Sequence, residues 1–490
     1  MNLKILFSDI EKQVFGKEDI EINGLSYDSR KISGNFLFFA LNGAHTSGTK
    51  FIEDAISKGA VCVVSQEKIE NIKCTNIVVK DIMTVMAKVS AKFYDYPDKK
   101  LTVIGVTGTN GKTSITYMTE SILKSLNINI AVIGTINYRY ADVKIDAPNT
   151  TPQSLDLYKM MNDIVKHGIK YLIMEVSSHS LVLGRVLGIE FDVAVFTNLT
   201  QDHLDFHKNM ENYFEAKKTL FESLKSNVKK KQKFAIINSD DIYGKKLIEN
   251  IDKNIVNISY ATKDEKAKCF AKNIKVTSKG TSFDLISVYG NSQIKVNLVG
   301  LHNVYNLLAC ICICFSLGIK FEYIINNISK TVAAPGRLEP VNNNKEFSVL
   351  VDYAHTDDAL QNVLLALRNI CSANIITVFG CGGNRDKTKR PKMAKVACNL
   401  SDFVVITSDN PREEDPNVII KDVEAGAIET GKTNYKVIVD RKEAIEYAIG
   451  IAQKNDIVLL AGKGHENYQI IGREKIHFDD REIAQNILSK

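Results

Sequence analysis

The stretch from Leu101 to Leu126 has the layout of a phosphate-binding loop. An apolar run is followed by a turn with two glycines, then by Lys112-Thr113-Ser114 and a stretch with helical apolar spacing. In such loops backbone N–H groups cradle phosphates, the lysine reaches the terminal phosphates and the hydroxyl residue holds Mg²⁺. The usual pattern has a glycine where Val106 stands, so an ordinary strand-to-helix turn is the alternative. We predict an ATP site made of Gly108, Thr109, Asn110, Gly111, Lys112, Thr113 and Ser114.

Acidic and imidazole side chains follow two apolar runs further along the chain. Tyr171 to Met174 leads into Glu175, and the run that ends at Phe196 is followed by Asp202 and His203. Open α/β sheets bind ligands at the carboxyl edge of their strands. Glu175 and His203 are therefore candidates for a metal shell beside the phosphates. The structural alternative is that Glu175 caps a helix and His203 packs in a turn.

Lys217 occupies an unusual place in a predicted helix over residues 210–226. The apolar stripe of this helix contains Tyr213, Leu220 and Phe221, and Lys217 fills the gap in that stripe. Burial of an ammonium group is costly unless the group is paired or neutralised. A lysine that extends its amine to the surface is the ordinary explanation. A functional role for a buried lysine is the other.

The last part of the chain repeats the pattern of apolar strands with polar ends. Three strands lead into the segments 380–385, 409–412 and 462–466. Arg385 and Arg412 would offer guanidinium groups to a carboxylate, and Glu466 would accept from an ammonium. Together they suit a zwitterionic amino acid, although each arginine alone is more often part of a surface ion pair.

The arrangement of these motifs indicates an α/β protein of about three domains. The length of 490 residues is too great for one core. A polar, proline-containing linker over 94–100 and the segment Ala334-Pro335-Gly336-Arg337 mark two boundaries. We therefore predict domains over 1–98, 99–335 and 336–490.

Composition excludes several classes of protein. The 63 basic and 57 acidic residues give a net charge of only +6, and no basic block has interleaved aromatic residues, so a nucleic-acid partner is not indicated. Nine cysteines, an odd number without a C-x-x-C pair, favour a reducing, cytoplasmic location. No signal-peptide pattern and no apolar stretch of membrane-spanning length is present.

The motifs, taken in order, resemble those of the Mur ligases, the ATP-dependent amide ligases of peptidoglycan precursor synthesis. The resemblance covers nearly the whole chain. It rests on Thr107-Gly108-Thr109-Asn110-Gly111-Lys112-Thr113, Glu175-Val176-Ser177-Ser178-His179, Asn198 to Asp205, His302-Asn303 with Asn306, Pro335 to Glu339, and Asp352-Tyr353-Ala354-His355. The family's loop lacks the early glycine, which accounts for Val106.

The resemblance implies a role for each domain and for many residues. It implies a uridine-nucleotide domain, a central P-loop ATPase domain and a Rossmann-like C-terminal domain for the incoming amino acid. Lys217 matches a lysine that the family carries as a carbamate, and with Thr113, Glu175 and His203 it would hold Mg²⁺, two ions being expected. Further nucleotide contacts would be Asn303, Arg337 and Asp352. The muramoyl-dipeptide side would be Tyr27, Ser29, Asn149, Thr150, Thr151, Ser177 and Arg185.

Within the family, Tyr27 to Arg30 and the C-terminal motifs resemble the member that extends UDP-N-acetylmuramoyl-L-alanyl-D-glutamate by a third residue. The form Asp409-Asn410-Pro411-Arg412 is that of members that take meso-diaminopimelate, whose second carboxylate Arg412 and Arg385 can pair with. L-lysine would leave a desolvated arginine unpaired. The resemblance implies an amino-acid site of Arg385, Asp409, Asn410, Pro411, Arg412, Gly462 and Glu466. Leu183 and the loop 44–46 depart from the family pattern.

Two rival functions remain at this stage besides the same ligase acting on L-lysine. A P-loop switch would hydrolyse ATP without any amino acid, and it would not need paired arginines in the C-terminal block. A folate polyglutamate ligase shares the loop, but its first block would not carry a uridine-type Asp-Ser-Arg segment. We expect a monomer that converts small-molecule substrates in the cytoplasm without entering a membrane.

Overall fold

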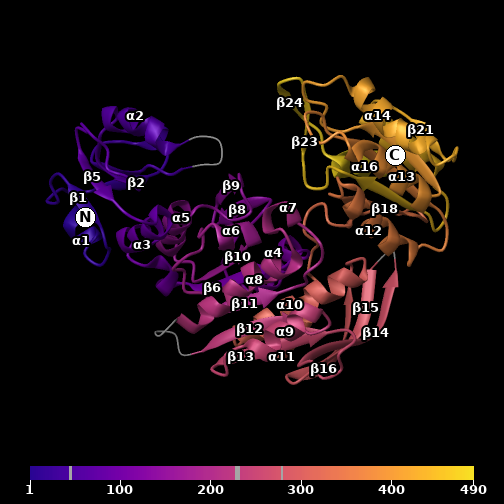
Figure 1. Ribbon diagram of the computed structural model, residues 1–490. Helices are drawn as coiled ribbons and strands as arrows, with labels where there is room; N and C mark the ends of the chain where they lie inside the picture. Colours follow the sequence, from indigo (N-terminus) through magenta and orange to yellow (C-terminus); the bar gives the residue numbers. More distant parts are fainter. Residues whose placement is uncertain (43–46, 227–231, 278–279, 490) are drawn as a thin grey trace. The chain divides into compact units, whose positions relative to one another are not determined.

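The computed structural model describes residues 1–42, 47–226, 232–277 and 280–489 (Figure 1). The loop 44–46, which departs from the family pattern, lies outside these residues. Contacts divide the chain into two compact units. Unit 1 comprises Met1–Thr116 and Asn127–Ser259, and unit 2 comprises Tyr117–Leu126 and Tyr260–Lys490. The helix α4 (Lys112–Ser125) and the strand β13 (Ile255–Ala261) each contribute residues to both.

Unit 1 begins with a five-stranded sheet. Its spatial order is β1 (Gln13–Phe15), β5 (Thr75–Val78), β4 (Ala60–Ser65), β3 (Phe36–Phe39) and β2 (Gly24–Ser26), all parallel except β1. The helices α1 (Leu3–Leu6) and α3 (Ile82–Phe93) cover one face, and α2 (Ile52–Ser57) covers the other. Because both faces are covered, consecutive residues of β3 are apolar: Phe39 packs in one core and Phe38 in the other. Short 3₁₀ helices lie at Ser29–Lys31, Gly48–Phe51 and Pro97–Lys100.

The second sheet region of unit 1 positions the phosphate loop. Its order is β12 (Lys233–Asn238), β11 (Val193–Phe196), β6 (Thr102–Thr107), β10 (Tyr171–Glu175), β7 (Ile130–Ile133), β8 (Asn137–Tyr140) and β9 (Val143–Asp146). The central strands are parallel, so β6, β10 and β11 end at one edge. The helices α5 (Ser154–Lys166) and α8 (Met210–Glu222) pack on this sheet through Tyr158 and Leu220. Shorter helices are α6 (Ser178–Val182), α7 (Leu204–His207) and α9 (Ile242–Asn250), and the 3₁₀ helix Ser223–Ser226 follows α8.

Unit 2 also contains antiparallel strands and a mainly apolar helix. The strands are β14 (Cys269–Thr277), β15 (Gly280–Ser287) and β16 (Gly290–Val296), and the helices are α10 (Leu301–Ser316) and α11 (Phe321–Ile328). Cys310, Cys312 and Cys314 are completely buried in α10, so they pack in the core of this unit.

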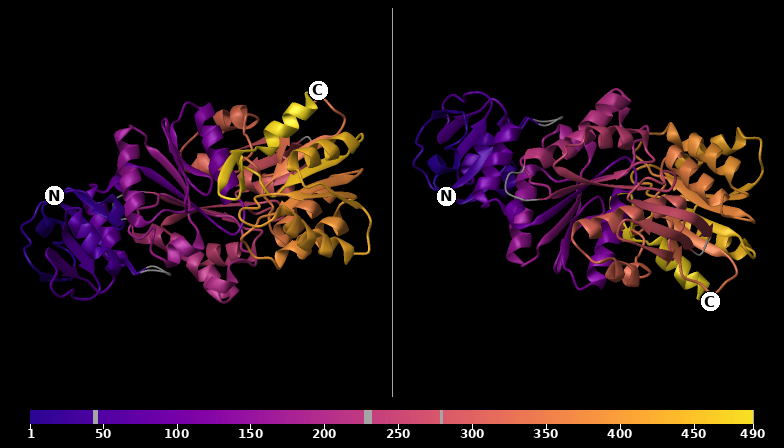
Figure 2. Two further views of the ribbon diagram at one scale, coloured as in Figure 1. Left: turned by 90° about the horizontal axis from the view of Figure 1, so that it is seen from above. Right: turned by 90° about the horizontal axis from the view of Figure 1, so that it is seen from below.

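The C-terminal sheet of unit 2 is doubly wound. Its order is β17 (Glu339–Val341), β18 (Ser348–Asp352), β22 (Ile457–Ala461), β19 (Ile375–Cys381), β20 (Phe403–Ser408) and β21 (Tyr435–Val437), and only β17 is antiparallel. One face is covered by α12 (Asp357–Arg368), α13 (Lys389–Leu400) and α14 (Pro416–Ile428), the other by α15 (Arg441–Ile451) and α16 (Asp480–Leu488) (Figure 2). A separate hairpin is formed by β23 (Tyr468–Ile471) and β24 (Glu474–His477). This arrangement confirms the predicted fold class.

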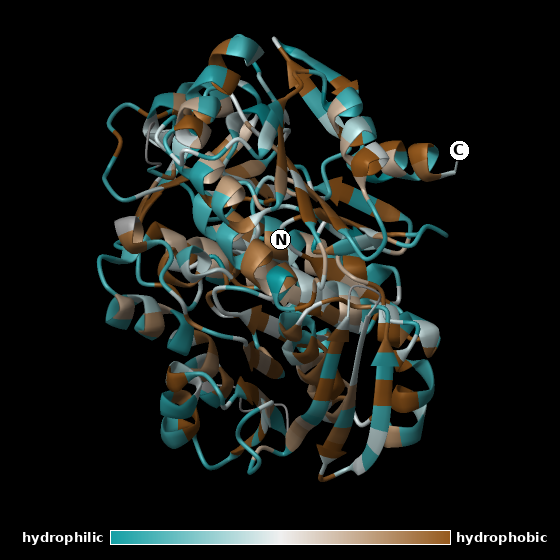
Figure 3. Ribbon diagram, turned by 90° about the vertical axis from the view of Figure 1, so that its right-hand side faces the viewer, coloured by the Kyte–Doolittle hydropathy of each residue, from teal (hydrophilic) through white to brown (hydrophobic). Residues whose placement is uncertain are grey.

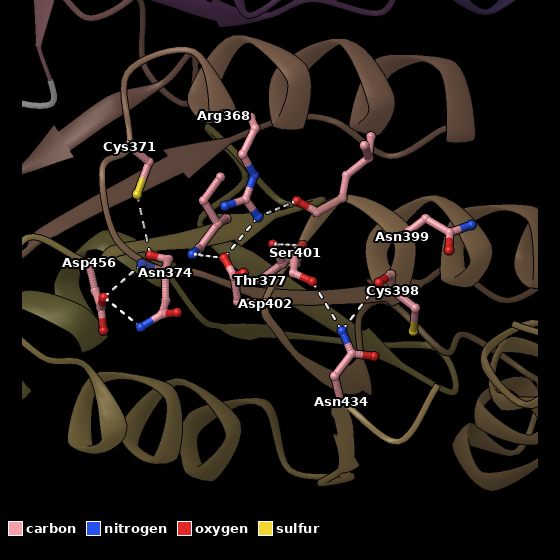
Figure 4. Close-up of polar contacts among 12 residues, drawn as sticks. Arg368, Cys371, Asn374, Thr377, Cys398, Asn399, Ser401, Asp402, Asn434 and Asp456 are labelled. Atoms are coloured by element: carbon pink, nitrogen blue, oxygen red, sulfur yellow. Dashed lines mark hydrogen bonds and ion pairs between the residues drawn. The ribbon is translucent and has the colours of Figure 1, made fainter. Parts of the chain in front are cut away.

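Polar side chains close the amino edge of this sheet (Figure 4). Asp402, just before β20, accepts from Arg368 and from the backbone of Ile375, both at 2.7–2.8 Å. Asp456, just before β22, accepts from the backbone N–H of Asn374 at 2.9 Å. The strands themselves are predominantly hydrophobic (Figure 3). The carboxyl edge is therefore the edge left for the ligand-binding segments.

Candidate active site

The loop after β6 has the backbone that a phosphate cradle requires. Gly108 has φ +144° and Gly111 has φ +92°, and a Cβ at Gly108 would lie 1.8 Å from Thr197 Oγ1. The backbone N–H of Asn110 donates to Asn198 Oδ1 at 3.0 Å, and Thr197 Oγ1 donates to the Asn110 carbonyl at 2.6 Å. The segment after β11 thus fixes the loop, and helix α4 starts directly behind it at Lys112. A helix start with glycine on both sides of the turn suits phosphate binding.

Lys112 and Lys217 share one acceptor. The carbonyl oxygen of Gly108 accepts from Lys112 Nζ at 2.8 Å and from Lys217 Nζ at 2.9 Å. Lys217 lies on α8 with 1% of its surface exposed, and its Nζ is 4.5 Å from the centre of the Tyr213 ring. The position of Lys217 on the inward face of the helix, predicted from the spacing of the apolar stripe, is confirmed.

The surroundings of Lys217 favour its neutral form. Burial, and next the positive charge of Lys112, hold the pKa of Lys217 well below its usual value, and Asp202 opposes this shift. A neutral amine is a nucleophile, whereas an ammonium is not. The site therefore holds a buried lysine beside the phosphate loop whose surroundings disfavour its charged form.

Glu175 lies at the end of β10 and binds the first turn of α4. Its carboxylate accepts from Thr113 Oγ1 at 3.0 Å, from the backbone N–H of Thr135 at 2.9 Å and from Thr135 Oγ1 at 3.0 Å. The helix-capping alternative for Glu175 is wrong, because Ser177 supplies the side-chain cap of α6. Thr135 was not predicted.

His203 has a left-handed backbone conformation directly before helix α7. It has φ +53° and precedes α7 without a side-chain cap bond, and its Nε2 is 3.3 Å from Asp202 Oδ2. Its ring packs edge to face on His179, with centroids 4.8 Å apart. Across the described residues, no three His, Cys, Asp or Glu side chains are grouped so that they could hold a metal ion. A metal ion bound here therefore needs ligands other than these four side-chain types, in addition to the Glu175 carboxylate and the His203 imidazole.

The segment 149–151 and Arg185 lie against the end of β10. Thr151 Oγ1 donates to the Glu175 carbonyl at 2.9 Å and accepts from the Ser177 backbone N–H at 3.2 Å. Arg185 Nη1 donates to the Thr151 carbonyl at 3.0 Å, while its buried Nε has no hydrogen-bond partner within the described part of the chain. The Asn149 carbonyl accepts from Tyr138 and Thr150 Oγ1 lies 3.1 Å from Thr135 Oγ1. The structure thus brings together five predicted substrate residues.

The two residues predicted for the uridine end differ in their surroundings. Tyr27 donates to the carboxylate of Asp156 on α5, and burial together with Asp156 raises the pKa of its phenol above the usual range. The charge of Arg185 also acts on Tyr27, so Tyr27 lies near the 149–151 group. Ser29 is buried at the start of the 3₁₀ helix that Asp28 caps. Within the described residues, no hydrogen bond joins Ser29 to the other predicted substrate residues.

Three further predicted nucleotide residues belong to unit 2. Asn303 on α10 donates to the Val299 carbonyl at 2.8 Å. The Asp352 carboxylate, at the end of β18, accepts from the backbone of Leu338 and Ala354 at 2.8 and 2.9 Å, and burial raises its pKa. The guanidinium of Arg337 lies 5.4 Å from the centre of the Tyr353 ring. Arg337 and Asp352 therefore lie near one another, at the carboxyl edge of the C-terminal sheet.

A buried lysine that we did not predict joins several residues predicted for the amino-acid site. Lys463, which is completely buried, lies 3.3 Å from Asp409 Oδ1, 3.3 Å from Asn410 Oδ1 and 3.6 Å from Glu466 Oε2. Asn410 Nδ2 in turn donates to Glu466 Oε2 at 2.8 Å. The strand ends of β20 and β22 thus converge as predicted. The signal for Lys463 was present, since it stands inside the motif 462–466.

Arg412 links this cluster to the segment after β19. Its Nη1 donates to the Gly383 carbonyl at 2.8 Å, and its backbone, at φ +53°, pairs with the β23–β24 hairpin. Gly383 fits only because it lacks a side chain, since a Cβ there would lie 1.9 Å from the Pro411 carbonyl oxygen. Arg385 is exposed, but its charge acts on Tyr353 together with those of Glu466 and Asp409. Gly462 has φ +112°, and a Cβ built on it would lie 3.7 Å from Asp409 Oδ2.

Comparison with known proteins decides the family. The chain matches a Mur ligase family catalytic domain over residues 21–94, a Mur ligase middle domain over 106–314 and a Mur ligase glutamate ligase domain over 336–464. The chain belongs to the Mur ligase family. The predicted boundaries near 98 and 335 fall between these matched ranges.

Full-length relatives carry one name. The chain is 46% identical over 496 residues, 100% of both proteins, to UDP-N-acetylmuramoyl-L-alanyl-D-glutamate--2,6-diaminopimelate ligase 1 of Clostridium acetobutylicum. It is 46% identical to the Fusobacterium nucleatum ligase of that name over 98% of this chain and 97% of the relative. A solved structure of a ligase so named matches with a TM-score of 0.73 and 32% identity, covering 100% of this chain and 99% of that one. No helix among the described residues of this Mur ligase is long and apolar enough to span a membrane.

Proposed function

We propose that this Mur ligase joins meso-diaminopimelate to the D-glutamyl γ-carboxylate of UDP-N-acetylmuramoyl-L-alanyl-D-glutamate, with hydrolysis of ATP to ADP and phosphate. The observation that carries the proposal is the C-terminal cluster of Asp409, Asn410, Arg412, Lys463 and Glu466, which has charges of both signs at one sheet edge. A phosphate loop in the same chain supplies the site for ATP. Relatives at 46% identity bear the name of this reaction.

The reaction proceeds in two steps. The γ-carboxylate oxygen attacks the γ-phosphorus of ATP, the bond to the β-phosphate oxygen breaks, and an acyl phosphate and ADP result. The free amine of diaminopimelate then attacks the acyl carbon, loses its proton and expels phosphate, leaving an amide. Lys112 and the loop N–H groups hold the phosphate oxygens as their charge develops. The acidic and amide groups around Lys463 hold the amino acid by its ammonium.

The residues around Glu175 fit magnesium, which prefers oxygen ligands. The Thr113 hydroxyl and the Glu175 carboxylate are 3.0 Å apart at the loop. We assign Thr113, Glu175, His203 and a carbamate on Lys217 to the binding of two Mg²⁺ ions. When bound, Mg²⁺ neutralises charge on the transferring phosphoryl group.

The burial of Lys217 and its bond to the Gly108 carbonyl beside the phosphate loop support a carbamate on this lysine. Its neutral Nζ attacks the carbon of CO₂, an N–C bond forms, and one proton is released to give an anionic carbamate. The cost of a buried cation is thereby removed, and oxygen ligands are added to a site that has few acidic side chains. In ¹³C NMR with ¹³C-bicarbonate we expect a carbamate signal in the wild type and none in Lys217→Met. A wild-type spectrum without that signal contradicts the assignment.

The Lys217→Ala variant tests the same residue by activity. We expect turnover to fall by at least 10²-fold, because the variant lacks the metal-binding carbamate. Short carboxylates added to the variant should restore part of the turnover, since they can supply the missing oxygens. Lys218→Ala is the matched control, because Lys218 is the next residue on α8 and pairs on the surface with Glu215. Full activity of Lys217→Ala would remove Lys217 from the mechanism.

The muramoyl-dipeptide substrate is assigned to the group around Arg185. Asn149, Thr150, Thr151, Ser177 and Arg185 offer hydroxyl, amide and guanidinium donors beside Glu175, which suits an anionic peptide end. Tyr27 and Ser29 are assigned to the uridine end. Location in the cytoplasm and a monomeric state complete the proposal, and the nine free cysteines support a reducing compartment.

The experiment that tests the proposed function is ADP release with Mg²⁺, ATP and the muramoyl dipeptide, in the presence of meso-diaminopimelate or L-lysine. Turnover with diaminopimelate alone supports the proposal and the role of Arg412. Turnover with L-lysine keeps the ligase but overturns the specificity. ADP release that needs no amino acid favours the P-loop switch instead.

A further inference from the structure

Arg390 is one of the most deeply buried charged residues of unit 2, and it lies outside the predicted site. It is at the start of α13, and none of its surface is exposed. Its Nη2 donates to both carboxylate oxygens of Glu414 at 3.0 Å, and its Nη1 donates to Asp422 on α14 at 2.9 Å. A buried guanidinium needs such partners, because an unpaired charge in the protein interior is strongly destabilising.

Glu414 connects Arg390 to the segment after β19. Its Oε1 accepts from the backbone N–H of Asn384, and Asn384 Oδ1 accepts from the backbone N–H of Glu413 at 3.2 Å. Arg390 Nη2 also lies 3.4 Å from the Gly382 carbonyl. The pair therefore ties residues 382–384 to residues 413–414 from both sides.

Arg412 depends on the same two segments. Its guanidinium donates to the carbonyl of Gly383, and the Gly383 N–H donates to the Asn410 carbonyl at 2.9 Å. Asn384 has φ +51°, in the left-handed region that asparagine adopts more readily than most non-glycine residues. Without the Glu414 contact, Asn384 and hence the Gly383 carbonyl would lose their fixed position. The direction of the Arg412 guanidinium would change with them.

A contribution to stability does not by itself account for the ion pair between Arg390 and Glu414. Buried ion pairs contribute little net stability compared with apolar residues of the same size. Arg390 Nε, moreover, is buried with no hydrogen-bond partner in the part of the chain that is described. The structural effect of the Arg390–Glu414 pair is thus to hold residues 382–384 against residues 413–414, and not to satisfy every donor of the guanidinium.

We propose that Arg390 and Glu414 are positioning residues that set the selectivity of the amino-acid site for a substrate with a second carboxylate. The inference rests on the proposed function, because it takes Arg412 as the group that meets this carboxylate. Neither residue needs to touch the substrate. Arg390 holds Glu414, Glu414 holds the 382–384 segment, and that segment orients Arg412.

The chain offers a matched control on the same guanidinium. Asp422 accepts from Arg390 Nη1, but its side chain is 41% exposed, and in the part of the chain that the structure describes no hydrogen bond or ion pair joins it to residues 382–384 or 412–414. Asp422→Asn therefore weakens an ion pair of Arg390 without disturbing the segments around Arg412. Glu414→Gln keeps the shape of the side chain and one acceptor oxygen but removes its charge. Glu414→Ala removes the acceptor as well.

The test compares KM and kcat for meso-diaminopimelate, L-lysine and ATP in the wild type, Glu414→Gln, Glu414→Ala, Arg390→Lys and Asp422→Asn. We expect KM for diaminopimelate to rise about tenfold in Glu414→Ala and less in Glu414→Gln, with KM for ATP within twofold of the wild type. The preference for diaminopimelate over L-lysine should fall in parallel. Asp422→Asn should match the wild type, and Arg390→Lys should lie between it and Glu414→Ala.

Two results would overturn the inference. One is an unchanged KM for diaminopimelate in both Glu414 variants. The other is an equal rise of KM for ATP and for diaminopimelate, which indicates a general loss of structure. Failure of the proposed function is recognised separately, because the wild type itself would then show no turnover with diaminopimelate. Glu414→Gln carries the test if Arg390→Lys does not fold, since the Glu414 side chain is partly exposed.

Discussion

At the scale of single residues, Lys463 is the buried cation at the centre of the proposed amino-acid site. In Lys463→Met the carboxylates of Asp409 and Glu466 lose their buried partner, and their side chains are only 10% and 16% exposed. Breaking a buried pair in this way costs about 3 kcal/mol. We expect urea denaturation to show a loss of about that size, together with a rise of at least tenfold in KM for diaminopimelate.

The control for this prediction is Lys475→Met. Lys475 lies over the same Tyr468 ring as Lys463, with Nζ 3.9 Å from its centre, but it is exposed. Its replacement should change stability by no more than about 0.5 kcal/mol. Equal effects of the two replacements would show that the ion pairs of Lys463 with Asp409 and Glu466 add nothing to stability or binding.

The sequence identifies residues whose signal is local and misses those whose partners are distant. The inward position of Lys217 could be predicted because its helix neighbours reveal the buried face. The role of Lys463 could not, because Asp409 is 54 positions away and only the parallel pairing of the sheet brings them together. Arg390 is similar, since Glu414 and Asp422 follow it on another loop and another helix.

At the scale of elements, Gly336 lets the segment before β17 pack closely against the backbone of Gly464. This glycine has φ +67°, and a Cβ on it would lie 2.2 Å from the Gly464 carbonyl carbon. Because the obstacle is backbone, it cannot move aside as a flexible side chain would. We expect Gly336→Ala to destabilise the protein by about 3 kcal/mol or more, from overpacking added to the conformational cost.

Gly431 separates the two causes. It has φ +68°, and nothing lies within 4 Å of a Cβ built on it. Gly431→Ala should therefore cost only the conformational term, about 1 kcal/mol. Thermal denaturation of both variants measures the difference. Equal losses would mean that the contact with Gly464 does not restrict the segment.

The sequence predicts strands that have strong apolar runs, together with the polar segments that follow them. The strands β19, β20 and β22 of the C-terminal sheet are examples. The β23–β24 hairpin could not be predicted, although Ile470 accepts from the Arg412 backbone at 3.0 Å. All four residues of β24 are exposed, so no alternation of buried and exposed positions marks it as a strand. Elements that lack a buried face leave no periodic signal.

At the scale of the whole molecule, histidines whose pKa is shifted by folding make the free energy of unfolding depend on pH. His465 packs on Tyr353 with ring centroids 4.7 Å apart, and its Nδ1 is buried. Burial, and after it the charges of Arg337, Arg481 and His355, lower its pKa from 6.5 to about 4. Between these two values the unfolded chain binds a proton that the folded chain does not. This residue therefore makes the protein less stable as pH falls from about 6.5 to about 4.

His477 should act in the opposite sense. It is exposed and paired with Glu482 at 2.7 Å, and this hydrogen bond raises its pKa above 6.5. Its contribution to stability is fully present below 6.5 and is lost as pH rises through the raised pKa. His477→Gln is therefore the control variant for His465→Gln, because the two replacements remove imidazole groups of opposite effect from the same unit.

Urea denaturation at pH 7 and pH 5 measures both effects. For His465, the change from pH 7 to pH 5 lowers the free energy of unfolding by at most about 2 kcal/mol. Only the range below 6.5, where the imidazole of the unfolded chain takes up its proton, contributes, and each pH unit of it is worth about 1.4 kcal/mol. Because His465 is partly exposed, we expect about 1 kcal/mol. The loss of stability between pH 7 and pH 5 should be smaller by that amount in His465→Gln than in the wild type, and no smaller in His477→Gln. An identical loss in His465→Gln and the wild type would mean that the imidazole is not held neutral by its surroundings, and that acid destabilises the enzyme through its carboxylates instead.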